Sequence, residues 1–196
     1  MQSERLDPDS IGPDLSLATL DLPSAVGERF QELYGTDNPP ADGAEWVDQM
    51  RTTIADARGR QPTVDDLCTT PDGEHAFVPA DGAGDSAATA AGGAEETSLC
   101  VLDPLAYPFL TGETGTVRST TPVRGETVTF DIGADDLAVS HDEAVVSLGV
   151  SDHLDGVDVD SAPVETVYRQ VCGYIQTFAD RAEYEQWAVE ADAVTM

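Results

Sequence analysis

Lysine is missing from this 196-residue chain, and basic side chains of any kind are scarce. The nine positive residues are all arginine and stand against 38 acidic ones, which gives a net charge of −29 at pH 7. Lysine chemistry is therefore excluded, and we expect no nucleic-acid partner because no basic stripe exists to displace counterions from phosphates. The acids are spread along the whole chain, and concentrated salt screens their repulsion, so the composition indicates adaptation to a salt-rich cytoplasm.

Long hydrophobic runs are absent as well. No window approaches the roughly 18 consecutive apolar residues of a membrane span. The N-terminal sequence also lacks the basic segment followed by an apolar one that marks a signal peptide. We therefore expect a cytoplasmic protein without a membrane partner, and its 40% hydrophobic content is sufficient for a folded core.

Cysteine is rare, with only three in the chain, at positions 68, 100 and 172. This odd number, without an export signal, argues against a disulfide framework and predicts reduced thiols. Sequence pairs typical of zinc sites do not occur, the three histidines show no metal-ligand spacing, and the acidic stretches lack the order of a calcium loop. We expect no resident cofactor.

Hydrophobic periodicity predicts two amphipathic helices in the first part of the chain, at 22–34 and 44–58. A turn of helix is expected at 63–67 and a strand at 74–79. Residues 80–96 are nearly all small or acidic and predict a linker or surface loop.

The second part of the chain changes character. Short β-rich segments separated by turn residues predict strands at 114–119, 127–132 and 144–150. The segment VYRQVCGYIQTF is expected to be a buried strand, or a helix leading into one, and 181–192 to be an amphipathic closing helix.

These elements predict an α+β fold, in which helices flank a small antiparallel β-sheet core and a helical extension stands at the N-terminus. We divide the chain into an N-terminal helical region at 1–79, an Ala/Gly-rich linker or loop at 80–96, and a second domain at 97–196 that holds two of the three cysteines.

Cys100 and Asp103 stand three residues apart in an apolar run, so a helical turn would place thiol and carboxylate on one face. Burial would raise the pKa of that carboxyl and suit it to proton transfer. Alternatively, Asp103 caps a helix that begins at Pro104, and Cys100 and Cys172 are small buried hydrophobes. Cys68 precedes a turn; we expect it to be more exposed than the other two cysteines, and the sequence shows no convincing partner for it.

The run LCVLDPLAYPFLTGETGTVRSTTPVRGETVTFDI resembles the core motif of the organomercurial (alkylmercury) lyase family. The similarity resumes at AVVSLGV and at YRQVCGYIQTFADRAEYEQWA. These segments cover about residues 98–190 and keep the family's order: Cys-x-x-Asp, a glycine-containing hairpin, a second cysteine and a Trp-bearing helix.

The resemblance implies that Cys100 and Cys172 are catalytic thiols and Asp103 the catalytic carboxyl. The implied reaction is mercury detoxification by protonolysis: two soft thiolates bind the mercury of an organomercurial, and Asp103 delivers a proton to carbon. Hg(II) is product rather than cofactor, held by the same three residues. Low-molecular-weight thiols and a mercuric reductase are the partners that the resemblance implies.

The chain departs from the family pattern in two places. The turn Ser119-Thr120-Thr121 lacks a further cysteine that many members carry, and residues 1–79 match the family's N-terminal part poorly. A role of Cys68 as a mercury-transfer thiol is one way to compensate for these departures. The alternative function is a lyase-like protein that binds or delivers Hg(II) or Cu(I) without turnover; it needs the cysteines but no proton donor.

Overall fold

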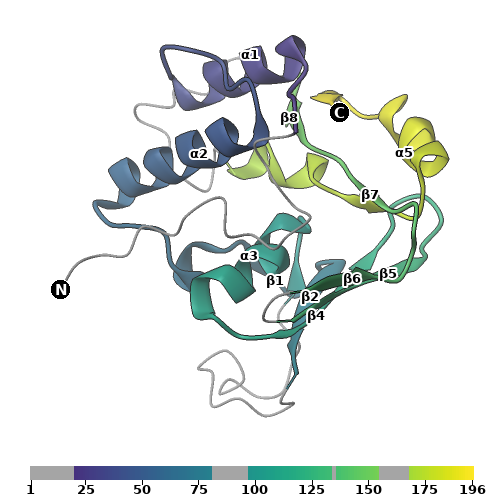
Figure 1. Cartoon of the computed structure of the whole chain (residues 1–196). Helices are drawn as coiled ribbons and strands as arrows, with labels where there is room; N and C mark the ends of the chain where they lie inside the picture. The colour runs from purple at the N-terminus through teal and green to yellow at the C-terminus, as the bar shows by residue number, and fades with distance from the viewer. Residues whose placement is uncertain (1–19, 81–96, 134–135, 155–167) are drawn as a thin grey trace.

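The computed structural model describes residues 20–80, 97–133, 136–154 and 168–196. Apart from Ala80, the expected linker at 80–96 lies outside these residues. Figure 1 shows two helices, α1 and α2, on one side of the molecule and a β-sheet on the other. Within the described residues, no helix is both long and apolar enough to cross a membrane.

The two predicted N-terminal helices are present as α1 (Ser24–Tyr34) and α2 (Gly43–Arg58). The apolar stripe of α1 buries Val26, Phe30 and Leu33, and the Phe30 ring packs on Trp46 of α2 with ring centroids 5.5 Å apart. Each helix ends at a glycine with a positive φ, which is the conformation that glycine adopts most easily. Local pattern therefore determines both helices.

The main sheet has six strands in the order β1-β3-β2-β4-β5-β6, and every neighbouring pair is antiparallel. Its strands are β1 (Thr69–Thr70), β2 (His75–Pro79), β3 (Thr97–Ser98), β4 (Gly115–Thr120), β5 (Thr127–Ile132) and β6 (Leu137–Val139). The predicted α+β class is confirmed. Because β2 lies between β3 and β4, the segments before and after residues 81–96 build one sheet.

Helix α3 (Leu102–Thr111) packs against β2, β3 and β4 of this sheet. The predicted strands at 114–119 and 127–132 are confirmed as β4 and β5. Their inward positions alternate with exposed ones, as expected for a sheet with one buried face.

The predicted strand at 144–150 is instead two strands, β7 (Val145–Val146) and β8 (Gly149–Ser151). They have different partners, because β7 pairs with β9 (Thr177–Phe178) and β8 with β10 (Ala193–Thr195). Ser147 makes the break: its hydroxyl donates to the carbonyl of Tyr174 and accepts from the backbone N–H of Gln176.

The described part of the segment around the third cysteine starts with helical residues Tyr168 and Arg169, continues through the 3₁₀ turn η5 (Cys172–Tyr174) and reaches β9, as expected for a helix leading into a strand; Cys172 itself lies in the 3₁₀ turn. It leads through β9 into the closing helix α5 (Arg181–Ala188), which is shorter than predicted. Asp180 caps α5, while the fully buried Glu183 carboxylate accepts hydrogen bonds from the backbone N–H groups of Ala179 and Arg124. These bonds attach α5 to the β4–β5 turn.

Candidate active site

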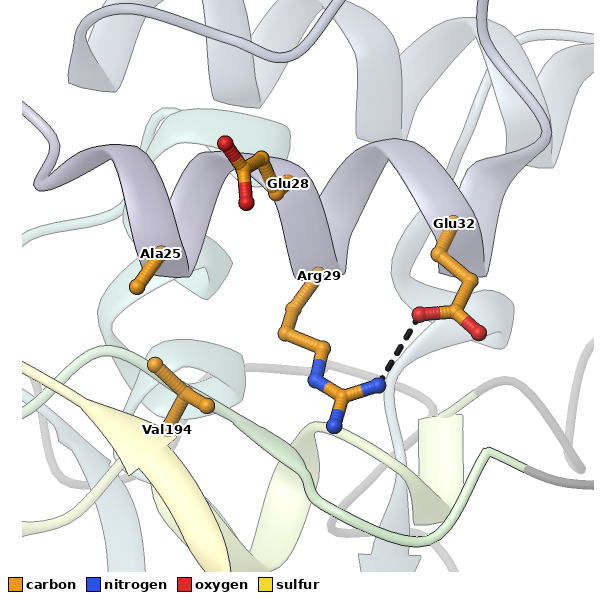
Figure 2. A pocket seen from close by; sticks show the side chains of 5 residues that line it. All are labelled: Ala25, Glu28, Arg29, Glu32 and Val194. Carbon is orange, nitrogen blue, oxygen red and sulfur yellow. Dashed lines mark hydrogen bonds and ion pairs between the residues drawn. The ribbon is translucent and has the colours of Figure 1, made fainter.

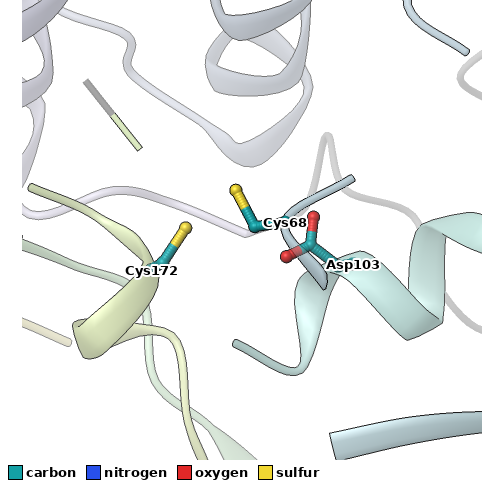
Figure 3. A group of neighbouring side chains, drawn as sticks. All are labelled: Cys68, Asp103 and Cys172. Atoms are coloured by element: carbon teal, nitrogen blue, oxygen red, sulfur yellow. The ribbon is translucent and has the colours of Figure 1, made fainter. Parts of the chain in front are cut away.

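Three segments that are distant in sequence meet at the thiols. Cys68 lies between the 3₁₀ turn η3 (Val64–Asp66) and β1, Cys100 between β3 and α3, and Cys172 at the start of η5. Cys100 and Cys172 both belong to the hydrophobic core. In Figure 3 the side chains of Cys68, Cys172 and Asp103 point into the same region, each from a different segment.

Cys100 and Asp103 contact each other directly, since the Cys100 thiol donates to Asp103 Oδ2 over 3.1 Å. The interpretation of Asp103 as a helix cap is wrong, because α3 already begins at Leu102 and its N-cap is Val101. Asp103 therefore lies inside the first turn. Its carboxylate is occupied by the Cys100 thiol and by the backbone N–H of Cys68.

Cys172 joins the other two thiols. Its sulfur lies next to the thiols of both Cys100 and Cys68, which are the largest influences on its pKa. The sulfurs of Cys172 and Cys68 and a carboxylate oxygen of Asp103 all lie within 4.8 Å of one another. The thiols differ in access to solvent, because Cys100 is 2% and Cys172 8% exposed whereas Cys68 is only half-buried.

Cys68 has close neighbours in the structure, the Cys172 sulfur and an Asp103 oxygen, although the sequence showed no convincing partner for it. Its neighbours come from segments more than 30 residues away, and the pairing of β1 with β3 brings Cys68 beside the loop that carries Cys100. Strands of two residues leave no recognisable hydrophobic pattern, so the sequence around Cys68 carried no local signal for this contact.

The electrostatics favour protonated Cys100 and Cys172 thiols beside a carboxyl whose pKa is raised to about 6. Burial raises the pKa of Asp103 to about 6, although hydrogen bonds from Cys100 and from the Cys68 backbone act to lower it. Interactions in which the Cys172 thiol acts as donor toward the Cys100 and Cys68 sulfurs, together with burial, raise the pKa of Cys172. For Cys100, contact with Cys172 lowers the pKa, but burial and the charge of Asp103 outweigh it and the net shift is upward.

Tyr168 is a further polar residue at the site that the sequence did not reveal. Burial raises the pKa of its phenol, and the nearby charges of Cys68, Asp66 and Asp103 raise it further. The hydroxyl therefore stays protonated, and the side chain packs against the core that contains Cys100 and Cys172.

A buried network holds the two cysteine-bearing loops together. The Val101 N–H donates to the Ile175 carbonyl over 3.1 Å. The Gln176 side-chain amide donates to the carbonyls of Leu99, at 3.0 Å, and Cys172, at 3.5 Å. Both loops are thus fixed through residues adjacent to the reactive side chains, which limits how far the sulfurs can separate.

His75 completes this network and is neutral. The Gln176 nitrogen donates to carbonyls, so the Gln176 oxygen must accept from His75 Nε2 at 3.0 Å, and Nδ1 then accepts from the Ser119 hydroxyl at 2.7 Å. Burial lowers the pKa of His75 and outweighs the opposite effect of Gln176. Ser119 opens the turn in which the family resemblance leads us to expect a cysteine, and its hydroxyl is used here to orient His75.

Two surface hollows lie outside the thiol cluster. The first, about 260 Å³, is bordered by α1 and β10, contains no thiol, and its Arg29 is paired with Glu32 at 2.9 Å (Figure 2). The second, about 300 Å³, borders residues next to Cys100 and Cys172; it is lined by Asp72, Glu74, Leu99, Pro122, Gly173, Gln176 and Trp187. Neither hollow is lined by Cys68, Cys100, Cys172 or Asp103. The thiol–carboxyl cluster formed by these four residues is the candidate site because it brings thiols and a carboxyl into contact.

Comparison with known families agrees with this geometry. The model of the alkylmercury lyase (MerB) family matches residues 86–196, more than half of the chain. The matched segment contains Cys100, Asp103 and Cys172, while Cys68 precedes it. No curated protein matches the chain. On the strength of the family match, the chain belongs to the alkylmercury lyase family.

Proposed function

We propose that this protein is an organomercurial lyase that cleaves carbon–mercury bonds by protonolysis, giving a hydrocarbon and Hg(II). The observation that carries the proposal is the Cys100 thiol bonded to the Asp103 carboxylate at 3.1 Å, with the Cys172 thiol in contact. Thiolates are the ligands that soft metals prefer, and a carboxyl in hydrogen-bond reach can move the proton that each thiol must lose.

The reaction begins with a substrate R–Hg–SR′, in which an external thiol carries the organomercurial. Cys172 forms a sulfur–mercury bond while the bond to R′S breaks, and the Cys172 proton leaves with R′SH. Cys100 then binds mercury as its proton passes to Asp103. Asp103 gives that proton to the carbon, whose bonding pair to mercury becomes the new C–H bond, and Hg(II) remains on two thiolates.

The surroundings of the site suit both the transfer of a thiol proton to Asp103 and its later delivery to carbon. Because burial raises the pKa of Asp103 to about 6, the carboxyl can accept a proton from a thiol and later return it near neutral pH. Burial also keeps water from competing for the transferred proton. Mercury itself offsets the raised thiol pKa values, since a bound metal favours the deprotonated sulfur.

The proposal includes a cytoplasmic setting, because protein thiols stay reduced there. Low-molecular-weight thiols would deliver the substrate and remove the product, and a mercuric reductase would be the final acceptor. Mercury is substrate and product in this scheme, and no resident cofactor is involved.

The test is release of methane or benzene from methyl- or phenylmercury by the full chain in concentrated salt with excess thiol. We expect Asp103→Asn to lose roughly 10²- to 10⁴-fold in rate, the usual contribution of a general acid–base group. Cys100→Ser and Cys172→Ser should abolish turnover. The control is Asp56→Asn, which removes an exposed carboxylate on α2 and should leave the rate unchanged.

One observation favours a second function, soft-metal binding or delivery without turnover. Cys68, Cys172 and Asp103 are close enough together to hold a single metal ion. Such a protein would bind Hg(II) or Cu(I) equally well with Asp103→Asn if the two sulfurs suffice. Tight Hg(II) binding by wild-type protein that releases no hydrocarbon would exclude the lyase function and favour this alternative.

A further inference from the structure

Cys68 is a reactive side chain that the proposed cleavage reaction does not use. It lies outside the family-matched segment, yet its sulfur is within 4.8 Å of both the Cys172 sulfur and a carboxylate oxygen of Asp103. Figure 3 shows it between Cys172 and Asp103. The site therefore holds three thiols where two suffice for the cleavage step.

The position of Cys68 is fixed by the fold. Two residues earlier, the buried Asp66 accepts a 2.6 Å bond from Arg60 and a 2.8 Å bond from the Thr63 N–H, which holds η3 in place. Directly after Cys68, β1 pairs with β3, the strand that precedes Cys100. Both ends of the residue are thus anchored, and its own N–H is bonded to Asp103.

The three thiols form a path from the core toward solvent. Cys100 is the most buried, Cys172 contacts both of the others, and Cys68 has the greatest exposure. A metal held by Cys100 and Cys172 can therefore keep Cys172 as a ligand while its second bond moves to Cys68. Exchange of this kind proceeds through attack by an incoming thiolate, so a third thiol in contact lowers its cost.

We propose that Cys68 is the exit ligand of this enzyme: it takes Hg(II) from Cys100 after carbon–mercury cleavage and presents the ion to an external thiol. This role rests on the proposed lyase function. In the step, the Cys68–mercury bond forms, the Cys100–mercury bond breaks, and the Cys68 proton passes through the Asp103 carboxylate to Cys100. Mercury stays Hg(II) throughout, and the thiol–carboxylate pair at Cys100 and Asp103 is restored for the next substrate.

The test loads the full-length protein with one equivalent of mercuric chloride and follows loss of the ultraviolet sulfur–mercury absorption when glutathione is added. In Cys68→Ser we expect transfer to slow about tenfold at glutathione well below the millimolar effective concentration of a tethered thiol, and to recover at high glutathione. Hydrocarbon formed in a single turnover should keep its wild-type rate. Thr69→Ser, an exposed change next to Cys68, should transfer mercury like wild type.

Each outcome separates the two proposals. Transfer by Cys68→Ser at the wild-type rate would overturn the exit role, as would loss of the first turnover, because Cys68 would then act in cleavage itself. If wild type releases no hydrocarbon yet mercury transfer depends on Cys68, the lyase function fails and the transfer role stands. Cys68→Ala provides a second test should the serine variant fold poorly.

Discussion

At the scale of single residues, the site contains a buried carboxylate that destabilises the fold and hydrogen-bonded side chains that fix the backbone around it. Asp103 keeps a charge in apolar surroundings, and burial raises its pKa to about 6. The neutral His75 and the Gln176 amide fix the backbone beside both core cysteines. A carboxyl positioned for proton transfer is thus maintained at the expense of stability.

The folded pKa of Asp103 lies above its unfolded value, so the folded state binds this proton more tightly. The resulting stability is present below about pH 4 and is lost as pH rises through about 6. Asp103→Asn should therefore raise Tm at pH 7.5 by about 3 °C, corresponding to roughly 1 kcal/mol, and by less at pH 5. Thermal unfolding at both pH values measures this; a Tm difference that is the same at both would contradict it.

At this scale, one contact of the site could be predicted from the sequence and others could not. The three-residue spacing of Cys100 and Asp103 predicted their contact, although Cys100 lies in the bend before α3 and only Asp103 lies in the first turn of that helix. Nothing in the sequence indicated that Cys68 contacts Cys172 and Asp103, or that His75 supports the site. The positions of Cys68 and His75 follow from the pairing of β1 and β2 with strands far along the chain, which local spacing does not encode.

At the scale of elements, the long periodic segments were predictable and the short ones were not. Helices α1 and α2 and strands β4 and β5 have amphipathic patterns that suffice to define them. The predicted strand at 144–150 failed because the Ser147 hydroxyl bonds to another segment and divides it. Elements of two or three residues, such as β7 and η5, exist only through such tertiary bonds.

The attachment of α5 gives a prediction at this scale. Glu183→Ala would leave the backbone N–H groups of Ala179 and Arg124 without their acceptor, so we expect a loss of about 3 kcal/mol in the free energy of unfolding. Urea unfolding measures the change. Glu185→Ala is the matched control, since that side chain is exposed and, among the residues that the structure describes, pairs with Arg181 alone, at 3.2 Å. Equal effects of the two substitutions would show that the buried carboxylate does not fasten the helix.

At the scale of the whole molecule, the net charge of −29 is the dominant property. Repulsion among so many carboxylates opposes compaction, and it is screened over about 10 Å in 0.1 M salt but only about 3 Å in 1 M salt. Adaptation to a salt-rich cytoplasm therefore predicts that the stability of the folded state increases with salt concentration.

We expect Tm to rise steadily when KCl increases from about 0.1 M to about 2 M, because the Debye length shrinks over this range. Differential scanning fluorimetry at neutral pH would follow the rise. Sorbitol at matched osmolality is the control and should reproduce little of it, since it screens no charge. A Tm that stays flat or falls with KCl would refute the adaptation to salt.

Because β2 lies between β3 and β4, a truncation that removes β2 divides the main sheet. A fragment that begins at residue 86, where the family match begins, keeps β3 and β4 but loses the strand that joins them. Its exposed strand edges would favour aggregation, so we expect this fragment to be insoluble while the full chain is soluble. The segment that matches the family model is therefore smaller than the segment that forms the main sheet, and a functional test of this protein requires the full chain.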